Sequence, residues 1–287
     1  MLTMQSDHLN LKQIAESGQC FRMNRIEENK YSLIAYGKYV ELSQVSKNKI
    51  LIDPSSAVDS SSGENFPSEE DFSIWEKYFD IEYDYGSVVK KLMEGKDDFI
   101  RNAVIYGSGL RILRQEPFEI LISFIISQNK NIPAIKSAVE KLCQHYGEEK
   151  RCLNRPGETY FDFPKPEALA AAGKDALRAL GIGYRDEYVH SAAVAVSEGR
   201  LDLSQLQNKD SDSLMNELMS LKGVGKKVAS CVALFGFHRF EIYPVDVWIN
   251  RVNKEIYKNK FSWQTYGDIA GLVQQYMFYY IRNCERT

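Results

Sequence analysis

Residues 221–251 read LKGVGKKVASCVALFGFHRFEIYPVDVWINR, and this stretch decides the fold of the second part of the chain. The segment before it, Asp212–Leu221, has leucines at i, i+4 and i+7, the spacing of one helix face. Gly223 and Gly225 allow a tight turn, after which a second helix is predicted to begin at Lys226. The unpaired amides at the start of that helix could bind a phosphate. The stretch therefore predicts a helix–turn–helix hairpin with an anion site.

Two residues near the hairpin could carry chemistry. Lys227 is predicted in the first turn of the second helix, where the helix dipole disfavours an ammonium ion and favours a nucleophilic amine. Asp246 is predicted to cap the next helix. Taken singly, Lys227 could be a surface lysine and Asp246 only a capping residue, so these structural alternatives stay open at this point.

The chain divides into two parts with different patterns. The first part contains short segments rich in β-branched and aromatic residues, such as Tyr31–Tyr39 and Lys49–Asp53, which indicate strands. The polar stretch Pro54–Asp71 is predicted to be an exposed loop. We predict an α+β protein with an antiparallel β domain in residues 1–115 and an all-α domain in residues 116–287.

The predicted helices of the second part share apolar periodicity and are separated by connections rich in Gly and Pro. No internal repeat is visible. The helices are predicted at Pro117–Ile126, Ala134–Tyr146, Pro166–Ala172, Asp186–Ser197, Asp212–Leu221, Lys226–Phe237, Val247–Tyr257 and Tyr266–Asn283.

Composition narrows the class of protein. Hydrophobic residues make up 44% and charged residues 26%, as in an ordinary globular protein. The five cysteines form no C-x-x-C pair, which argues against a disulfide framework and a zinc or iron–sulfur site. We expect no metal and no organic cofactor. Because apolar runs are short and the N-terminus lacks a signal pattern, we expect a cytoplasmic monomer, associated with the nucleoid in a bacterium.

Charge is distributed unevenly along the chain. The net charge is -3, which taken alone speaks against a nucleic-acid binder. Residues 1–100 carry 11 Lys+Arg against 18 Asp+Glu, so the positive charge is concentrated in residues 101–287. A surface that faces phosphates is therefore expected in the second part, because that contact depends on local charge.

The motif L-x-G-V-G-x-K-V-A-x-C at residues 221–231, followed by P-V-D-V at 244–247, resembles the helix–hairpin–helix, Gly/Pro-Asp superfamily of DNA base-excision glycosylases. The resemblance implies that Lys227 is the Schiff-base nucleophile of a bifunctional glycosylase/AP lyase. It also implies that Asp246 is the second essential residue. Monofunctional relatives activate water instead of using a lysine.

Other segments resemble the 8-oxoguanine branch of that superfamily. Ser17–Arg22, SGQCFR, is similar to its S-G-Q-x-F-R signature. The resemblance implies that the carbonyl of Gly18 accepts a hydrogen bond from N7–H, a donor that 8-oxoguanine has and guanine lacks. Gln274 and Phe278, four residues apart on a predicted helix, would bind the Watson–Crick edge and stack on the purine, while Cys231 covers its other face.

Three further residues are implied to contact DNA opposite the lesion. SQNKNI at 127–132 resembles a segment whose asparagine, here Asn129, fills the gap left by the flipped base. LGIGYR at 180–185 resembles L-G-L-G-Y-R, in which Tyr184 would wedge into the stack and Arg185 would donate to the orphaned cytosine. The implied partner is double-stranded DNA that contains 8-oxoguanine.

The sequence departs from the better-known animal enzymes at three positions. Trp248 stands where they have a phosphate-binding histidine, and Phe235 replaces a smaller pocket residue. Ala134 occupies the place of an arginine that reads the cytosine opposite the lesion. Loss of one such contact removes about 1–3 kcal/mol of discrimination, so we predict relaxed selectivity for the opposite base.

Two alternatives stay open. The enzyme could prefer another lesion, such as an oxidised pyrimidine or an alkylated purine, although Gly18 and Gln274 argue against it. The chain could instead be a catalytically silent module that only binds DNA, although the pairing of Lys227 with Asp246 argues against silence.

Overall fold

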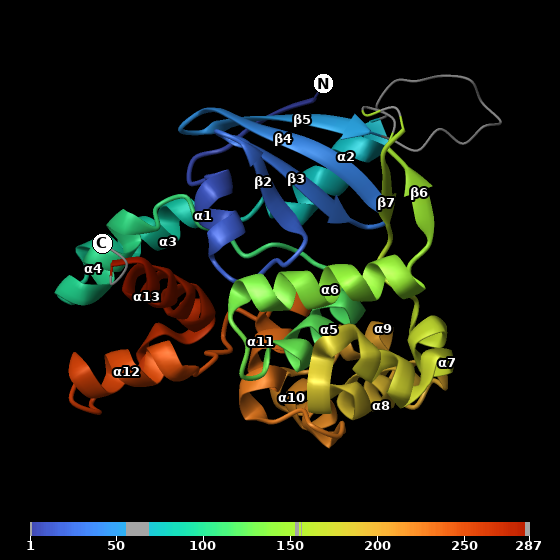
Figure 1. Ribbon diagram of the computed structural model, residues 1–287. Coiled ribbons are helices and arrows are strands. Elements are labelled where there is room, and N and C mark those ends of the chain that lie inside the picture. Colours follow the sequence, from blue (N-terminus) through green and yellow to red (C-terminus); the bar gives the residue numbers. More distant parts are fainter. Residues whose placement is uncertain (1, 56–68, 153–154, 156, 285–287) are drawn as a thin grey trace.

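An antiparallel sheet of five strands forms the N-terminal part of the protein (Figure 1). The computed structural model describes residues 2–55, 69–152, 155 and 157–284. The strands are β1 (Leu2–Gln5), β2 (Met23–Glu27), β3 (Lys30–Ala35), β4 (Lys38–Ser46) and β5 (Lys49–Ser55), in the order β1-β5-β4-β3-β2. Alternate side chains of β3 are buried, because successive residues of a strand point to opposite faces. Helices α1 (Leu11–Glu16) and α2 (Glu69–Tyr78) contribute to the core beneath the sheet.

The segment predicted as one strand, Tyr31–Tyr39, is in fact a hairpin. β3 ends at Ala35 and β4 begins at Lys38, and the turn between them has positive φ at Tyr36 and Gly37 (52° and 67°). Two-residue hairpin turns require such angles. The segment is rich in β-forming residues throughout, so its composition did not reveal the turn.

The stretch Pro54–Asp71, predicted as an exposed loop, is structured at both ends. β5 continues through Ser55 and α2 begins at Glu69. The part of the predicted loop between them, residues 56–68, lies outside the described residues.

The rest of the chain is largely helical, and every helix predicted there is present (Figure 1). Their ends differ from the prediction by a few residues at most; in α7 the helical conformation is interrupted at Gly173, just after the predicted end. The helices are α3 (Tyr85–Glu94), α4 (Asp98–Tyr106), α5 (Pro117–Ser127), α6 (Ile132–Tyr146), α7 (Pro166–Leu177), α8 (Asp186–Ser197), α9 (Leu203–Leu206), α10 (Ser211–Ser220), α11 (Lys226–Gly236), α12 (Val247–Glu255) and α13 (Ala270–Cys284).

The expectation of an all-α second domain is wrong in one respect. Two short strands, β6 (Glu149–Arg151) and β7 (Thr159–Phe161), pair antiparallel between α6 and α7. Three residues are too few to show the alternation that marks a strand in a sequence. No helix within the described ranges is long and apolar enough to span a membrane.

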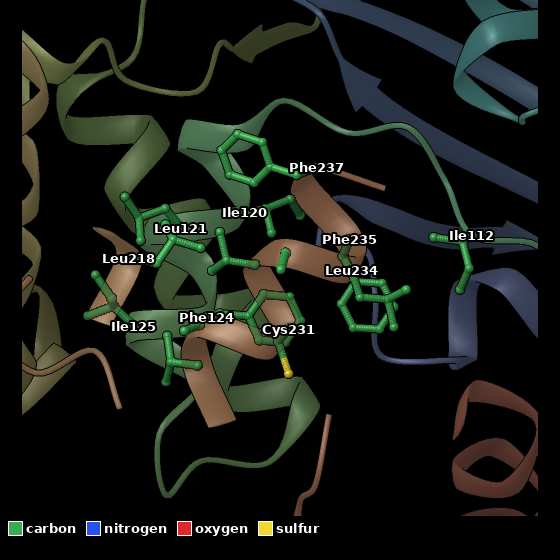
Figure 2. Close-up of a cluster of buried hydrophobic side chains, with 14 of the residues drawn as sticks. Ile112, Ile120, Leu121, Phe124, Ile125, Leu218, Cys231, Leu234, Phe235 and Phe237 are labelled. Carbon is green, nitrogen blue, oxygen red and sulfur yellow. The ribbon is translucent and has the colours of Figure 1, made fainter. Parts of the chain in front are cut away.

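The core of the helical part centres on α5. Almost all of its residues are buried, and α11 packs closely on it: a Cβ on Gly236 would lie 3.3 Å from Ile120 Cβ. Figure 2 shows side chains of α5 and α11 packed together with one from α10, namely Ile120, Leu121, Phe124, Ile125, Leu218, Cys231, Leu234 and Phe235. This packing fixes the direction in which the start of α11, and therefore Lys227, points.

The larger core takes residues from both sides of the predicted domain boundary near residue 115. Val88 of α3 and Ala103 of α4 belong to the same buried cluster as Tyr276 of α13. Figure 1 shows α4 beside α13. Helices α3 and α4, which precede the predicted boundary, thus share their core with α13 at the end of the chain. The boundary itself stays a prediction.

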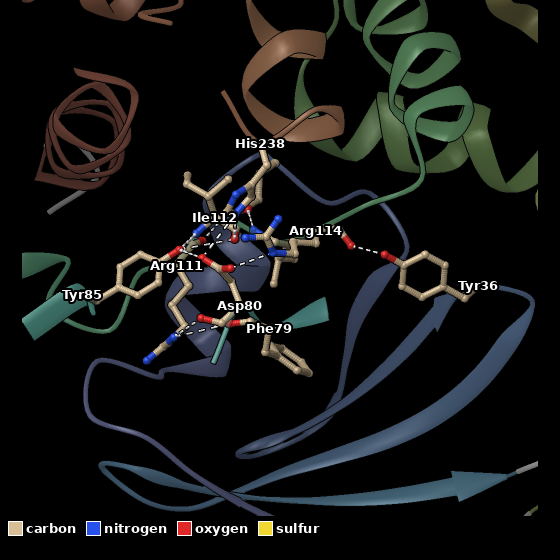
Figure 3. Close-up of polar contacts among 10 residues, drawn as sticks. Tyr36, Phe79, Asp80, Tyr85, Arg111, Ile112, Arg114 and His238 are labelled. Carbon is tan, nitrogen blue, oxygen red and sulfur yellow. Dashed lines mark hydrogen bonds and ion pairs between the residues drawn. The ribbon is translucent and has the colours of Figure 1, made fainter. Parts of the chain in front are cut away.

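A buried polar network joins the segment before α3 to the linker before α5 (Figure 3). Asp80 accepts hydrogen bonds from Arg114 Nε (2.8 Å) and from the Tyr85 hydroxyl (3.0 Å). His238 Nε2 lies 3.3 Å from the same carboxylate, and Arg111 donates to the Asp80 carbonyl at 2.8 Å. Burial alone would raise the pKa of Asp80. The interactions with His238, Arg114 and Tyr85 together outweigh burial and hold that pKa below its usual value. The network fixes the linker between α4 and α5.

Candidate active site

A cavity of about 700 Å³ lies between the start of α11, the start of α6, α13 and the turn after α1. This volume is typical of a site that encloses a small organic group. Eight of the predicted site residues line it: Gly18, Asn129, Gly225, Lys227, Cys231, Asp246, Gln274 and Phe278. Three others, Gly223, Tyr184 and Arg185, lie outside its lining.

The two hairpin glycines have different local requirements. Gly223 has φ +80°, and a Cβ there would lie 2.2 Å from Cγ of Tyr188, so only glycine fits. Gly225 is the N-cap of α11; no side chain caps the helix, and a Cβ on Gly225 would meet nothing within 4 Å. The space beside Gly225, in front of the first-turn amides of α11, is therefore open, and an anion can approach the amides there.

Lys227 and Asp246 both reach the cavity from the ends of helices. The ammonium nitrogen of Lys227 lies 5.3 Å from the centroid of the Phe124 ring. Asp246 caps α12 by accepting a hydrogen bond from the Ile249 amide at 2.9 Å. Among the residues that the structure describes, no ion pair within 4.0 Å joins Lys227 to Asp246; the Lys227 side chain has a hydrogen bond with the Cys231 thiol.

Burial governs the protonation of the two acidic groups beside Lys227. It raises the pKa of Asp246 more than the Ile249 hydrogen bond and the Lys227 charge lower it. It also raises the pKa of the Cys231 thiol to about 11, against the opposing effect of Lys227. The thiol is therefore neutral near pH 7, which suits an apolar contact with a base better than nucleophilic attack.

The residues predicted to read the base face the same cavity. Gly18 has φ +77°, and a Cβ there would lie 3.0 Å from Ile132 Cδ1 and 3.4 Å from Phe278 Cε1, so a larger residue would crowd both. Gln274 is only 4% exposed, yet its Oε1 has no hydrogen-bond partner within the described ranges. A buried polar atom left unpaired costs about 1–3 kcal/mol. Such an atom on a cavity wall points to a polar ligand.

The predicted gap-filling residues lie together beside the cavity. Asn129 Nδ2 donates to the Tyr184 hydroxyl at 3.0 Å, and the Tyr184 side chain is half exposed. The guanidinium of Arg185 stacks on the Tyr184 ring at 4.4 Å. Arg185 is buried and donates to the Gln128 carbonyl (2.8 Å) and the Ile182 carbonyl (3.0 Å). In this structure it supports Tyr184 and the loop of Asn129, and its predicted contact with cytosine stays a prediction.

Phe124 and Gln275 are among the cavity-wall residues that sequence reasoning did not single out. Phe124 lies in an apolar helix whose pattern distinguishes no single position, and Gln275 follows Gln274 without any motif of its own. Among the departures from animal enzymes, Phe235 stacks on Phe124 (5.5 Å, 14°) and Trp248 lines the cavity. Ala134 lies in the first turn of α6, outside the lining residues.

Comparisons with known proteins find matches for both parts of the chain. Residues 1–121 match the family described as 8-oxoguanine DNA glycosylase, N-terminal domain. Residues 122–274 match the HhH-GPD superfamily of base excision DNA repair proteins. A probable N-glycosylase/DNA lyase of Methanothermobacter thermautotrophicus is 30% identical over 238 residues, which are 73% of each chain.

Solved structures are similar over nearly the whole chain. MBOgg1 in complex with a low-affinity DNA ligand is 34% identical, with a TM-score of 0.88 over 99% of this chain and 96% of that one. The Clostridium acetobutylicum 8-oxoguanine glycosylase/lyase, in complex with double-stranded DNA containing cytosine opposite 8-oxoG, is 31% identical. Its TM-score is 0.86, and the match covers 97% of this chain and 93% of that one.

The fold and the hairpin site define the class: the chain belongs to the HhH-GPD superfamily of base excision DNA repair proteins. Within that superfamily it is of the 8-oxoguanine DNA glycosylase type, since residues 1–121 match the N-terminal domain of that type and nearly the full length of the chain follows the solved structures. Its activity is that of an N-glycosylase/DNA lyase.

Proposed function

We propose that the protein flips 8-oxoguanine out of double-stranded DNA and excises it through Lys227, with Asp246 as the second catalytic residue. The observation that carries the proposal is that one cavity is lined by Lys227, Asp246, the Gly18 turn and Gln274, whose buried amide oxygen has no hydrogen-bond partner among the described residues. A nucleophile and base-reading groups thus face the same small volume, as excision of a flipped base requires.

Recognition depends on the polar edge of the base. The Gly18 carbonyl oxygen accepts a hydrogen bond from N7–H of 8-oxoguanine. In guanine, N7 has a lone pair in place of this hydrogen, and it would be repelled by the carbonyl oxygen. Gln274 binds the Watson–Crick edge, and its buried Oε1 gains a hydrogen-bond partner, which it lacks among the described residues. Phe278 and the neutral thiol of Cys231 contact the two faces of the purine.

DNA is held by the hairpin and by the surface next to the cavity. The amides that follow Gly223 and Gly225 bind a backbone phosphate at the start of α11. Tyr184 and Asn129 enter the stack where the lesion leaves it, and this contact offsets part of the few kcal/mol that base flipping costs. Arg185 moves from backbone carbonyls to the acceptor edge of the orphaned cytosine.

The chemistry follows from the placement of Lys227 and Asp246. The Asp246 carboxylate, whose pKa is raised by burial, accepts a proton from the Lys227 ammonium group and stabilises positive charge on the sugar. The neutral amine forms a bond to C1′ as the N-glycosidic bond breaks, and the base leaves with its electron pair and takes up the proton that the attacking nitrogen gives up. The nitrogen lone pair then forms the C=N bond of the Schiff base as the C1′–O4′ bond breaks, and O4′ takes up the proton held by Asp246. Water accepts a proton from C2′, the electron pair of that C–H bond forms a C2′–C3′ double bond, and the C3′–O bond breaks so that the 3′ phosphate departs.

A panel of duplexes tests the lesion assignment. Each duplex carries 8-oxoguanine, an oxidised pyrimidine or an alkylated purine, and single-turnover release of the base is measured. We expect release of 8-oxoguanine to be at least a hundredfold faster than release of the others. A ratio on the order of a hundredfold is what the loss of two or more hydrogen bonds to the base would give. Equal or faster release of another lesion contradicts the assignment, and so does DNA binding without release of any base.

Relaxed selectivity for the opposite base is a finer part of the proposal. Ala134 has no side chain that could read the cytosine edge, and the loss of one such contact removes about 1–3 kcal/mol of discrimination. We expect comparable excision of 8-oxoguanine opposite C and opposite A in the same single-turnover assay. A hundredfold preference for C would contradict this part alone.

A further inference from the structure

The groups proposed to read the base come from opposite ends of the chain. Gly18 lies in the turn after α1, and Gln274 lies near the start of α13. Both must meet one rigid purine, so the distance between them has to be held within a fraction of an ångström. A contact that fixes α13 to the turn of Gly18 would therefore control recognition.

Gln275 makes that contact. Its side chain is 2% exposed, and its Nε2 donates to the carbonyl oxygen of Ser17 at 2.9 Å. Ser17 directly precedes Gly18, and Gln275 directly follows Gln274, so a single hydrogen bond joins the neighbours of both base-reading residues. Gln275 also lines the cavity.

The far side of the same turn is held by Gln19. This fully buried side chain donates to Ser17 Oγ (2.9 Å) and to the Arg111 carbonyl (2.7 Å), and it accepts from the Leu113 amide (2.8 Å). The linker in which Arg111 and Leu113 lie is in turn fixed by the Asp80 network (Figure 3). The turn is thus anchored to the body of the protein on one side and to α13 on the other.

We infer that Gln275 is a positioning residue for base recognition: it sets the Gly18 carbonyl at the distance from Gln274 that 8-oxoguanine requires. The inference rests on the proposed function of Gly18 and Gln274. Gln275 acts through Ser17 and Gln274 and contributes no group to bond cleavage. Steps that need no base in the cavity are therefore independent of it.

The test compares two reactions of the same protein. One is single-turnover excision of 8-oxoguanine, and the other is cleavage at a preformed abasic site, which uses Lys227 but no base. Gln275→Met keeps the length of the side chain and removes the donor, and Gln275→Leu is a second variant in case one substitution packs poorly. Gln44→Leu is the matched control, because Gln44 donates to the Leu9 carbonyl at 3.1 Å and lies outside the cavity lining.

We expect the Gln275 variants to lose about tenfold or more in excision, the effect of one weakened hydrogen bond, and to keep abasic-site cleavage within about twofold. Gln44→Leu is expected to leave both rates within about twofold of the wild type. Equal changes of both rates in the Gln275 variants, or no change in either, would overturn the inference. A wild-type protein that cleaves abasic sites but releases no 8-oxoguanine would contradict the proposed function itself.

Discussion

Asp246 caps a helix, and we propose a catalytic role for it as well; the chemistry of its side chain allows the two to be separated. Its carboxylate accepts a hydrogen bond from the Ile249 amide and so caps α12. The same carboxylate faces the cavity with a pKa that burial raises, which makes it a stronger proton acceptor than an exposed aspartate. An amide in its place can still accept the capping hydrogen bond, but it carries no negative charge and takes no proton.

Asp246→Asn is therefore expected to keep the fold and lose the chemistry. Excision should fall by about 10²–10⁴-fold, the usual contribution of a positioned general base. The unfolding free energy should change by less than about 0.5 kcal/mol, because asparagine caps helices as well as aspartate does. Asp246→Ala is the companion variant and should lose about 1 kcal/mol of stability as well. Near-normal excision by the Asn variant would show that Asp246 is only a cap.

At the scale of elements, the hairpin before α11 depends on two glycines for different reasons. Gly223 is required by its left-handed backbone and by the Tyr188 ring that packs on it. Gly225 has an ordinary backbone and open space where its side chain would be. The first glycine serves the fold, and we assign the second to close approach of a phosphate.

The two alanine variants should therefore behave differently. Gly223→Ala should lose about 2–4 kcal/mol of unfolding free energy, from backbone strain and overlap with the ring. Gly225→Ala should lose about 1 kcal/mol or less, yet bind DNA more weakly because a methyl group stands before the amides. Thermal unfolding and DNA titration of both proteins measure this. Equal losses of stability would refute the distinction.

Elements with a strong local pattern could be predicted from the sequence, and others could not. α8 has the predicted bounds, Asp186–Ser197, since its apolar spacing runs from end to end. β6 and β7 are too short to alternate visibly. The motif residues of the cavity were predictable because they lie in short segments that resemble the motifs of a family. Gln275 was not, because its partner Ser17 is 258 residues away and only the folded chain brings them together.

At the scale of the whole molecule, a buried carboxyl group lies where α5 meets the N-terminal part of the chain. Glu119 of α5 has a pKa raised to about 7 by burial, which outweighs the lowering effect of the Arg22 charge. Arg22 comes from the turn before β2 and donates to the Phe161 carbonyl at 2.5 Å. Ionisation of Glu119 therefore takes place inside the contact between the two parts.

Ionisation of Glu119 should make the unfolding free energy of the protein depend on pH. Because the pKa of Glu119 is higher in the folded protein than its ordinary 4.5, its contribution is fully present at low pH and is lost as pH rises from about 4.5 through about 7. Glu119→Gln should remove this loss, so the unfolding free energy of the variant relative to the wild type should rise by about 2–3 kcal/mol between pH 5 and pH 8. Denaturant unfolding across that range measures the difference, and parallel curves would contradict it.

The central claim is that Lys227 forms the bond to the sugar, and borohydride trapping tests it most directly. Reduction during reaction with a duplex containing 8-oxoguanine should give a covalent protein–DNA adduct, because borohydride fixes the Schiff base. Lys227→Gln should give no adduct while still binding the duplex. An adduct that persists in Lys227→Gln would contradict the assignment, as would base release by the wild type without any trapped adduct.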